Sequence, residues 1–183
     1  MRLRPFARRL RSWATVVMAA FCCIYGRAAP TASEVQLKAA FIFHFTQFIS
    51  WPAHTFEDPN APFVIGIVGD EPIDEALTEM VRGERVDGHP LQVRRLSRPA
   101  DAANCQIVYS SGDGEEKFRA ARFHGEPVLT VGETEGFLQS GGMIEFITEH
   151  NHVKLRINLP AAKAASLQIS SKLLRVAQVL SPE

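Results

Sequence analysis

Cysteine is scarce in this chain of 183 residues, which contains only three. Cys22 and Cys23 lie close to the N-terminus, and Cys105 is the only cysteine after them. If an N-terminal segment that includes the first two is removed, no internal disulfide can form. Cys105 precedes the apolar run QIVYS, so we expect a buried structural thiol rather than a reactive or intermolecular one.

Long hydrophobic runs are also missing. The apolar run near the N-terminus, from Trp13 to about Tyr25, has thirteen residues, whereas a membrane-spanning helix needs about 20. An arginine-rich start precedes it, and the small-residue pattern Gly26-Arg27-Ala28 follows it. This arrangement is typical of a secretory signal, and an uncleaved anchor is the alternative. We predict that residues 1–28 are removed and that residues 29–183 form a single exported domain.

The chain has no excess of basic charge, since 20 basic residues face 20 acidic ones. Residues 1–28 hold six of the basic residues and none of the acidic ones. Residues 29–183 therefore keep 14 basic and 20 acidic residues, a net charge of −6. Because phosphate binding depends on clustered lysine and arginine, nucleic acid is not an expected partner.

Motifs that carry catalytic chemistry are missing as well. The stretch GIVGDEP lacks the GxGxxG and Walker patterns and predicts a tight strand-to-helix turn. No Gly-x-Ser-x-Gly elbow is present. His150 and His152 flank a predicted turn, but no further histidine or cysteine has the spacing of a metal site. We therefore predict no catalytic residue, no metal, no cofactor and no enzymatic activity.

Aromatic residues concentrate in the stretch KAAFIFHFTQFISWP, residues 38–52. Its apolar positions recur at helical spacing, which predicts a helix over 34–50 that is mostly buried in its own domain. Ser33 and Gln36 have the spacing of a capping box, and Pro52 ends the helix. Phe43 points away from the main apolar stripe and is a candidate for exposure.

The remaining pattern alternates strands and helices. Strands are predicted over 62–70, 90–96, 106–110, 127–133, 143–150 and 153–159. Helices are predicted over 71–81, with Asp70 as its cap, over 114–123, and over 161–180, where Pro160 opens the last one; GFLQSGG adds a short helical turn. This order indicates an α/β domain whose C-terminal hairpin makes the sheet mixed.

The strand over 153–159 has a clear alternation. Leu155, Ile157 and Leu159 should face the core, because a shift by one residue would bury two cations. Lys154, Arg156 and Asn158 then lie on the other face. These groups fit an ordinary solvated surface or a contact surface, and the sequence leaves both open.

A contact surface would use five residues. Arg156 and Asn158, with Glu145 across the hairpin, would orient a partner segment or an anionic small ligand, since the guanidinium fork binds carboxylates in two places. Lys172 follows on the last helix, and Phe43 supplies an apolar contact. The loop over 53–61 is the alternative location for this surface.

Several segments together resemble the YfiR-like family of exported regulators. They are Lys38-Ala39-Ala40 with Trp51-Pro52, Ile65-Gly66-Ile67, Gly141 to Phe146, Ile157-Asn158, Ile169-Ser170 and Lys172-Leu173-Leu174. The resemblance covers about residues 34–180. It implies a Rossmann-like three-layer α/β sandwich with a mixed central sheet, the first and last helices packed on it, and a closing C-terminal hairpin.

The resemblance also implies a function. Such proteins are periplasmic homodimers that bind the periplasmic part of an inner-membrane diguanylate cyclase and repress it, which lowers cyclic-di-GMP and biofilm formation. Family members can carry disulfides, whereas Cys105 has no partner after residue 28, so redox control through an internal bridge is not expected. The alternative function is a periplasmic module that senses a small ligand and acts with another membrane receptor or transporter.

Overall fold

The computed structural model describes residues 32–56, 58–69, 72–112, 126–150 and 152–180. Three predictions fall outside these residues: the signal segment over 1–28, Asp70 as a helix cap and the helix over 114–123. Within the described part of the chain, no helix is long and apolar enough to cross a membrane.

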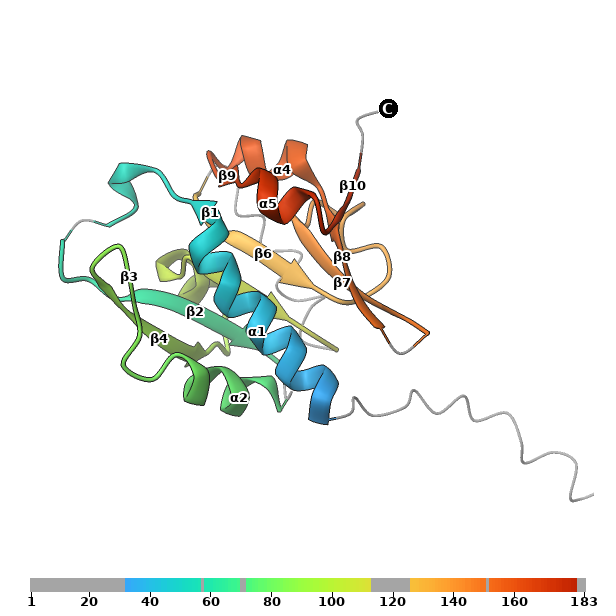
Figure 1. Cartoon of the computed structure of the whole chain (residues 1–183). Helices are drawn as coiled ribbons and strands as arrows, with labels where there is room; N and C mark the ends of the chain where they lie inside the picture. Colours follow the sequence, from blue (N-terminus) through green and yellow to red (C-terminus); the bar gives the residue numbers. More distant parts are fainter. Residues whose placement is uncertain (1–31, 57, 70–71, 113–125, 151, 181–183) are drawn as a thin grey trace, which may run out of the picture. The chain divides into compact units, whose positions relative to one another are not determined.

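An eight-stranded sheet lies at the centre of the domain (Figure 1). Its spatial order is β10 (Gln178–Val179), β8 (His152–Ile157), β7 (Ile144–Glu149), β6 (Leu129–Gly132), β5 (Ile107–Ser110), β2 (Phe63–Val68), β4 (His89–Arg95) and β3 (Arg85–Val86). Neighbours from β7 to β4 are parallel, and so are β8 and β10, whereas β7–β8 and β3–β4 are antiparallel. The predicted mixed sheet and closing hairpin are confirmed.

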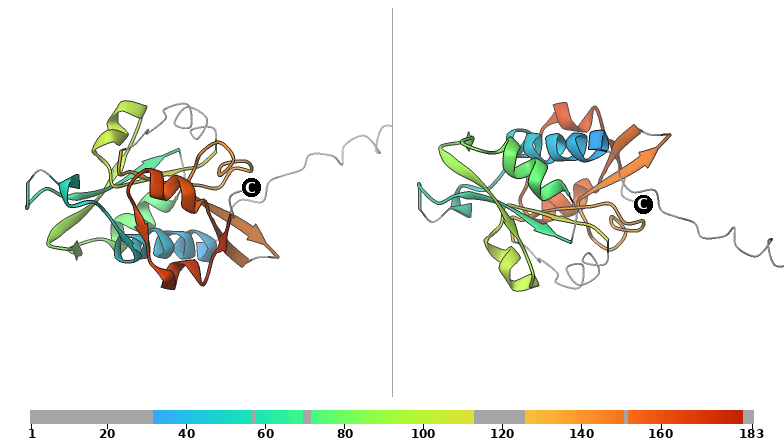
Figure 2. Two further views of the ribbon diagram at one scale, coloured as in Figure 1. Left: turned by 90° about the horizontal axis from the view of Figure 1, so that it is seen from above. Right: turned by 90° about the horizontal axis from the view of Figure 1, so that it is seen from below.

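Helical segments cover both faces of this sheet. Figure 2 shows α1 (Ala32–Phe48) and α2 (Ile73–Met80) on one face, and the buried residues of α4 (Leu159–Ala164) and α5 (Ser171–Leu174) belong to the same core cluster as those of α1. The short helix η3 (Pro99–Asn104) lies on the opposite face. Two separate clusters of buried side chains fill the two interfaces, the larger one under α1 and the smaller one around Ala102 and Cys105. This arrangement confirms the three-layer α/β fold.

Helix α1 is buried along one stripe at helical spacing. Val35, Ala39, Ile42 and Phe45 form this stripe, whereas Leu37, which fits the same apolar pattern in the sequence, is 44% exposed. The helix ends at Phe48, two residues before its predicted end, because residues 49 and 50 form β1 (Ile49–Ser50). Strand β1 pairs antiparallel with β9 (Gln168–Ile169), so tertiary pairing overrides the local helical pattern.

The single last helix predicted over 161–180 is wrong. The segment forms α4, β9, α5 and β10 in turn. Ser166 has a positive φ of 60°, which stops α4, and Ser170 begins α5 by accepting a hydrogen bond from the backbone N–H of Lys172 at 3.2 Å. The leucines at helical spacing are buried by several short elements, and β9 is held by its pairing with β1 rather than by local preference.

The hairpin side chains follow the predicted alternation. Leu155 and Ile157 are buried on the α1 face, and Lys154 is exposed. Leu159 is only half-buried, because it begins α4 instead of continuing the strand.

The segment GFLQSGG forms consecutive turns rather than the predicted helical turn. Gly141 has a φ of +98°, and a Cβ added to Gly142 would lie 2.3 Å from the ring of Phe137. The two glycines therefore make room for the chain reversal and for this ring.

Cys105 is a buried free thiol, as the sequence predicted. Burial raises its pKa from 9.0 to about 11; the charge of Arg94 opposes this rise, and the charge of Asp101 adds to it.

In a chain carrying Cys22→Ser and Cys23→Ser, we expect iodoacetamide at pH 8 to alkylate the native thiol of Cys105 at least ~100-fold more slowly than the same thiol in denaturant. Mass spectrometry of timed samples measures both rates, and equal rates would contradict the assignment.

Candidate functional site

The hairpin formed by β7 and β8 carries an ion pair on the face opposite α1. Glu145 and Arg156 occupy paired positions on the two strands, and Arg156 Nη1 donates a hydrogen bond to Glu145 Oε2 at 3.0 Å. The Glu145 side chain is 1% exposed, whereas that of Arg156 is 28% exposed. The Glu145 side chain is thus buried behind Arg156, and only the Arg156 side chain reaches solvent.

Asn158 has a structural role at the end of β8. Its side-chain oxygen accepts a hydrogen bond from the backbone N–H of Ala161 at 3.1 Å, which caps α4. Its side-chain nitrogen donates to the carbonyl oxygen of Leu138 at 3.2 Å. The amide therefore joins the hairpin to the turn that precedes β7, and both of its ends have partners inside the chain.

The other two predicted contact residues lie on the α1 face. Phe43 is half-buried and packs against the core under α1, so it is less exposed than a free contact residue would be. Lys172 is exposed on α5. Because successive side chains on a strand point to opposite faces, Arg156 projects away from the face that carries these two. The structure brings together Glu145 and Arg156, but it does not gather all five residues on one surface.

A second ion cluster ties α1 to the sheet. Lys38 Nζ contacts a carboxylate oxygen of Glu133, which directly follows β6, and lies 3.0 Å from Glu34 Oε1 one helical turn away. The Lys38 side chain is 9% exposed. Lysine is seldom buried without paired charges, and here two carboxylates supply them.

The charges and hydrogen bonds in this cluster shift the pKa values of Lys38 and Glu34. Burial alone would lower the pKa of Lys38, but the hydrogen bonds and charges of Glu133 and Glu34 outweigh it and raise the pKa. The hydrogen bond from Lys38 lowers the pKa of Glu34 against the effect of burial, and the Thr148 hydroxyl contributes a further hydrogen bond. Both shifts favour the charged forms of Lys38 and Glu34.

Sequence reasoning did not find this cluster. Lys38 and Glu34 are four residues apart and could have been paired as helix neighbours. Glu133 is 95 positions from Lys38, and only the packing of α1 over the end of β6 brings them together.

We also searched the residues that the structure describes for groups of side chains that could bind a metal ion. They contain no group of three or more histidine, cysteine, aspartate or glutamate side chains that could hold an ion. His150 and His152 are exposed at the turn of the hairpin.

Comparison with known protein families gives a match over nearly all of the described domain. The family described as YfiR/HmsC-like matches residues 35–178. No curated protein matches this chain.

Two solved structures have a low similarity to this chain. One is a conserved domain protein from Vibrio cholerae, with 13% identity and a TM-score of 0.47; the other is an ABC domain in complex with L-Trp from Streptococcus pneumonia, with 11% identity and a TM-score of 0.48. Each alignment covers 80% of this chain, and this chain spans 60% of the length of each of them.

Proposed function

Because this chain belongs to the YfiR/HmsC-like family, we propose that it binds the periplasmic part of an inner-membrane diguanylate cyclase and represses it. At the level of the family, membership supports a periplasmic regulator of diguanylate cyclase signalling rather than an enzyme. Repression of the cyclase would lower cyclic-di-GMP and biofilm formation. The match from residue 35 to residue 178 carries this proposal, since it runs from α1 to β10.

The residues of the family pattern serve mainly to build the fold. Lys38 joins α1 to the sheet, Gly142 accommodates the ring of Phe137, Asn158 caps α4, and Ser170 caps α5. Lys172 also belongs to the pattern but is exposed on α5, so a partner surface is better sought among exposed groups such as this one than among the pattern residues that build the fold.

We propose that Phe43 and Lys172 contact the partner on the α1 face, and that Arg156 makes a separate contact on the opposite face of the sheet. Lys172 and the guanidinium of Arg156 are accessible, and Phe43 offers part of an aromatic ring. Glu145 and Asn158 act through their internal partners, since Glu145 holds Arg156 and Asn158 holds the start of α4. A homodimer is part of the same proposal, and light scattering of the purified protein tests it.

Deletion of the gene is expected to raise cyclic-di-GMP, and an exported copy is expected to restore the lower level. Nucleotide extracted from deletion and complemented strains, both expressing the partner cyclase, is quantified by mass spectrometry. A copy without residues 1–28 serves as the control, because without the predicted signal it should not reach the periplasm. Unchanged nucleotide in the deletion strain would contradict repression.

The contact residues are tested by capture of the cyclase's periplasmic part. Reversing the charge in Lys172→Glu should weaken capture about 5-fold, which corresponds to about 1 kcal/mol for one exposed charge. Lys163→Glu is the matched control, because Lys163 is an equally exposed lysine on the neighbouring helix α4. Equal capture by Lys172→Glu and the unmodified protein would remove Lys172 from the surface.

A small-ligand sensor that acts with another membrane receptor or transporter is the second candidate function. An aromatic hollow beside Trp51 favours it, because such a hollow is suited to a compact ligand. The two functions are compatible, since a ligand shifts a regulator when it binds the free and the partner-bound states with different affinity.

A further inference from the structure

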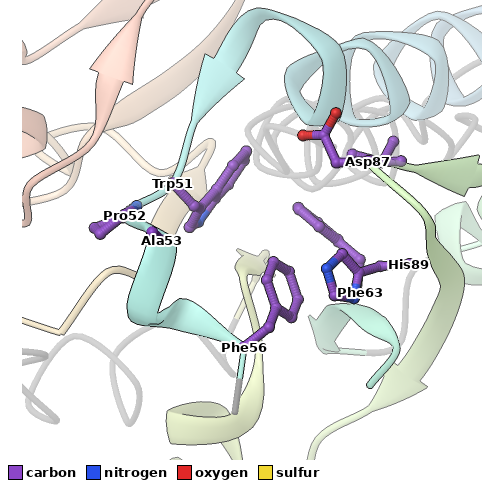
Figure 3. Close-up of a pocket in the computed structure, with 8 residues that line it drawn as sticks. Trp51, Pro52, Ala53, Phe56, Phe63, Asp87 and His89 are labelled. Carbon is purple, nitrogen blue, oxygen red and sulfur yellow. The ribbon is translucent and has the colours of Figure 1, made fainter. Parts of the chain in front are cut away.

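An aromatic hollow of about 210 Å³ lies between the segment that follows β1 and the hairpin formed by β3 and β4 (Figure 3). Four rings line it, and Pro52, Ala53, Val86 and Asp87 complete its wall. The rings belong to Trp51, Phe56, Phe63 and His89. Phe63 is buried at the start of β2, whereas the other three rings are half-buried and remain partly accessible to solvent.

The rings are held in place by contacts with one another and with neighbouring backbone. Trp51 meets Phe63 edge-on, with ring centroids 4.9 Å apart and an interplanar angle of 86°. The indole N–H of Trp51 donates to the carbonyl oxygen of Gln106 at 3.3 Å. Phe56 stacks on His89 at 3.7 Å between centroids. His89 Nδ1 lies 2.7 Å from the carbonyl oxygen of Ala61, where it acts as the donor. This preorganisation lowers the entropy lost when a ligand binds.

The only formally charged group among the lining residues that the structure describes is the carboxylate of Asp87. Asp87 sits at the tip of the β3–β4 hairpin with a φ of +50°, and its side chain is exposed. The nearest cation along this hairpin is Arg85, whose guanidinium donates to the carbonyl oxygen of Gly88. Arg85 itself does not line the hollow.

We propose that this hollow binds a small organic cation with an alkylated ammonium group. Aromatic faces attract such a cation through their quadrupoles, and a carboxylate at the rim adds a compensating charge. A lining of rings with one negative charge and no lysine or arginine disfavours an anionic ligand. The proposal does not depend on the cyclase, since it concerns binding by the chain itself.

Intrinsic fluorescence gives a direct measurement at the site. The full-length chain contains two tryptophans, Trp13 and Trp51, so a chain carrying Trp13→Phe reports from the hollow alone. Choline is the probe, and 3,3-dimethylbutan-1-ol is its uncharged analogue of the same shape. Choline should change the fluorescence saturably, with an affinity about 5-fold higher than that of the alcohol, because cation–π attraction at an accessible site contributes about 1 kcal/mol.

Two variants separate charge from shape. Asp87→Asn should weaken choline binding about 3-fold and leave alcohol binding unchanged, because asparagine also tolerates a positive φ and keeps the turn. Asp58→Asn is the matched control, since Asp58 is an exposed aspartate of the neighbouring loop that does not line the hollow. Titrations at constant ionic strength exclude general salt effects.

Two results would overturn the proposal. Equal affinity for choline and the alcohol would show a hollow that selects by shape and apolarity alone. No fluorescence change with choline in the millimolar range would show that the rings do not bind this class of cation. Either result leaves the proposed repression of a cyclase unaffected, because capture and nucleotide assays measure that separately.

Discussion

Arg156→Ala is expected to lower the free energy of unfolding by about 3 kcal/mol, the lower end of the range for breaking a buried ion pair. The reason is the burial of its partner, since the Glu145 side chain is 1% exposed and would be left without its cation. The 28% exposure of Arg156 lets water reach part of the pair, which keeps the loss at the low end. Urea unfolding of the single variant measures this loss.

The double variant Glu145→Leu/Arg156→Leu is the control for this prediction. Replacing both members of a buried ion pair by apolar residues of similar size is often neutral. We therefore expect the double variant to recover most of the stability that Arg156→Ala loses. A loss below about 0.5 kcal/mol for Arg156→Ala would contradict the prediction, because it would mean that solvent already satisfies Glu145.

This ion pair also limits how partner binding can be tested. The sequence alone suggests that Arg156→Ala removes a surface contact and leaves the fold intact. The structure places a buried carboxylate behind Arg156, so weaker capture by this variant would mix lost contact with lost folding. Lys172→Glu avoids the problem, because Lys172 is exposed on α5.

The sheet could be predicted from the sequence because its signals are local. Strand β2 is a continuous apolar run, and every one of its residues is buried, as expected for a central parallel strand. In β8, the alternation of apolar and charged residues defines both the hairpin and the face that each side chain takes. These patterns need no knowledge of distant residues.

The C-terminal segment could not be predicted in the same way. Residues 161–180 have leucines and alanines at helical spacing, which favours one helix. Strand β9 interrupts it because Ile169 pairs with Ile49, 120 positions earlier in the chain. Such pairing depends on where α1 ends, and a local pattern does not contain that information.

In the candidate site, too, some contacts follow from local sequence patterns and others depend on tertiary packing. The pairing of Glu145 with Arg156 follows from the hairpin register and could be anticipated from the sequence. The stacking of Phe56 on His89 joins a loop to a strand more than thirty residues later, and no periodic pattern links them. The contact of Lys38 with Glu133 is likewise a product of tertiary packing.

Lys38→Met is expected to lower the free energy of unfolding by about 3 kcal/mol at pH 7. Methionine keeps the apolar stem of the side chain and removes the ammonium group, so the loss comes mainly from the charge: Glu34 and Glu133 would remain close together without the cation between them. Lys163→Met is the matched control, because Lys163 is exposed on α4 and its replacement should change stability by less than about 0.5 kcal/mol.

The difference in unfolding free energy between the unmodified protein and Lys38→Met depends on pH, and this dependence identifies the charges responsible. The pKa of Glu34 is lowered from its ordinary value of 4.5, so its contribution is complete above pH 4.5 and is lost as the pH falls through the folded-state pKa. The pKa of Lys38 is raised from 10.5, so its contribution is complete below pH 10.5 and is lost as the pH rises through the folded-state pKa. The stability difference should therefore be largest between these limits and should shrink on both sides. Urea unfolding of both proteins at pH 3, 7 and 9 measures this difference, and only pH 3 lies outside the two limits. A difference in unfolding free energy at pH 3 as large as that at pH 7 would show that Lys38 stabilises α1 by packing rather than by its ion pairs.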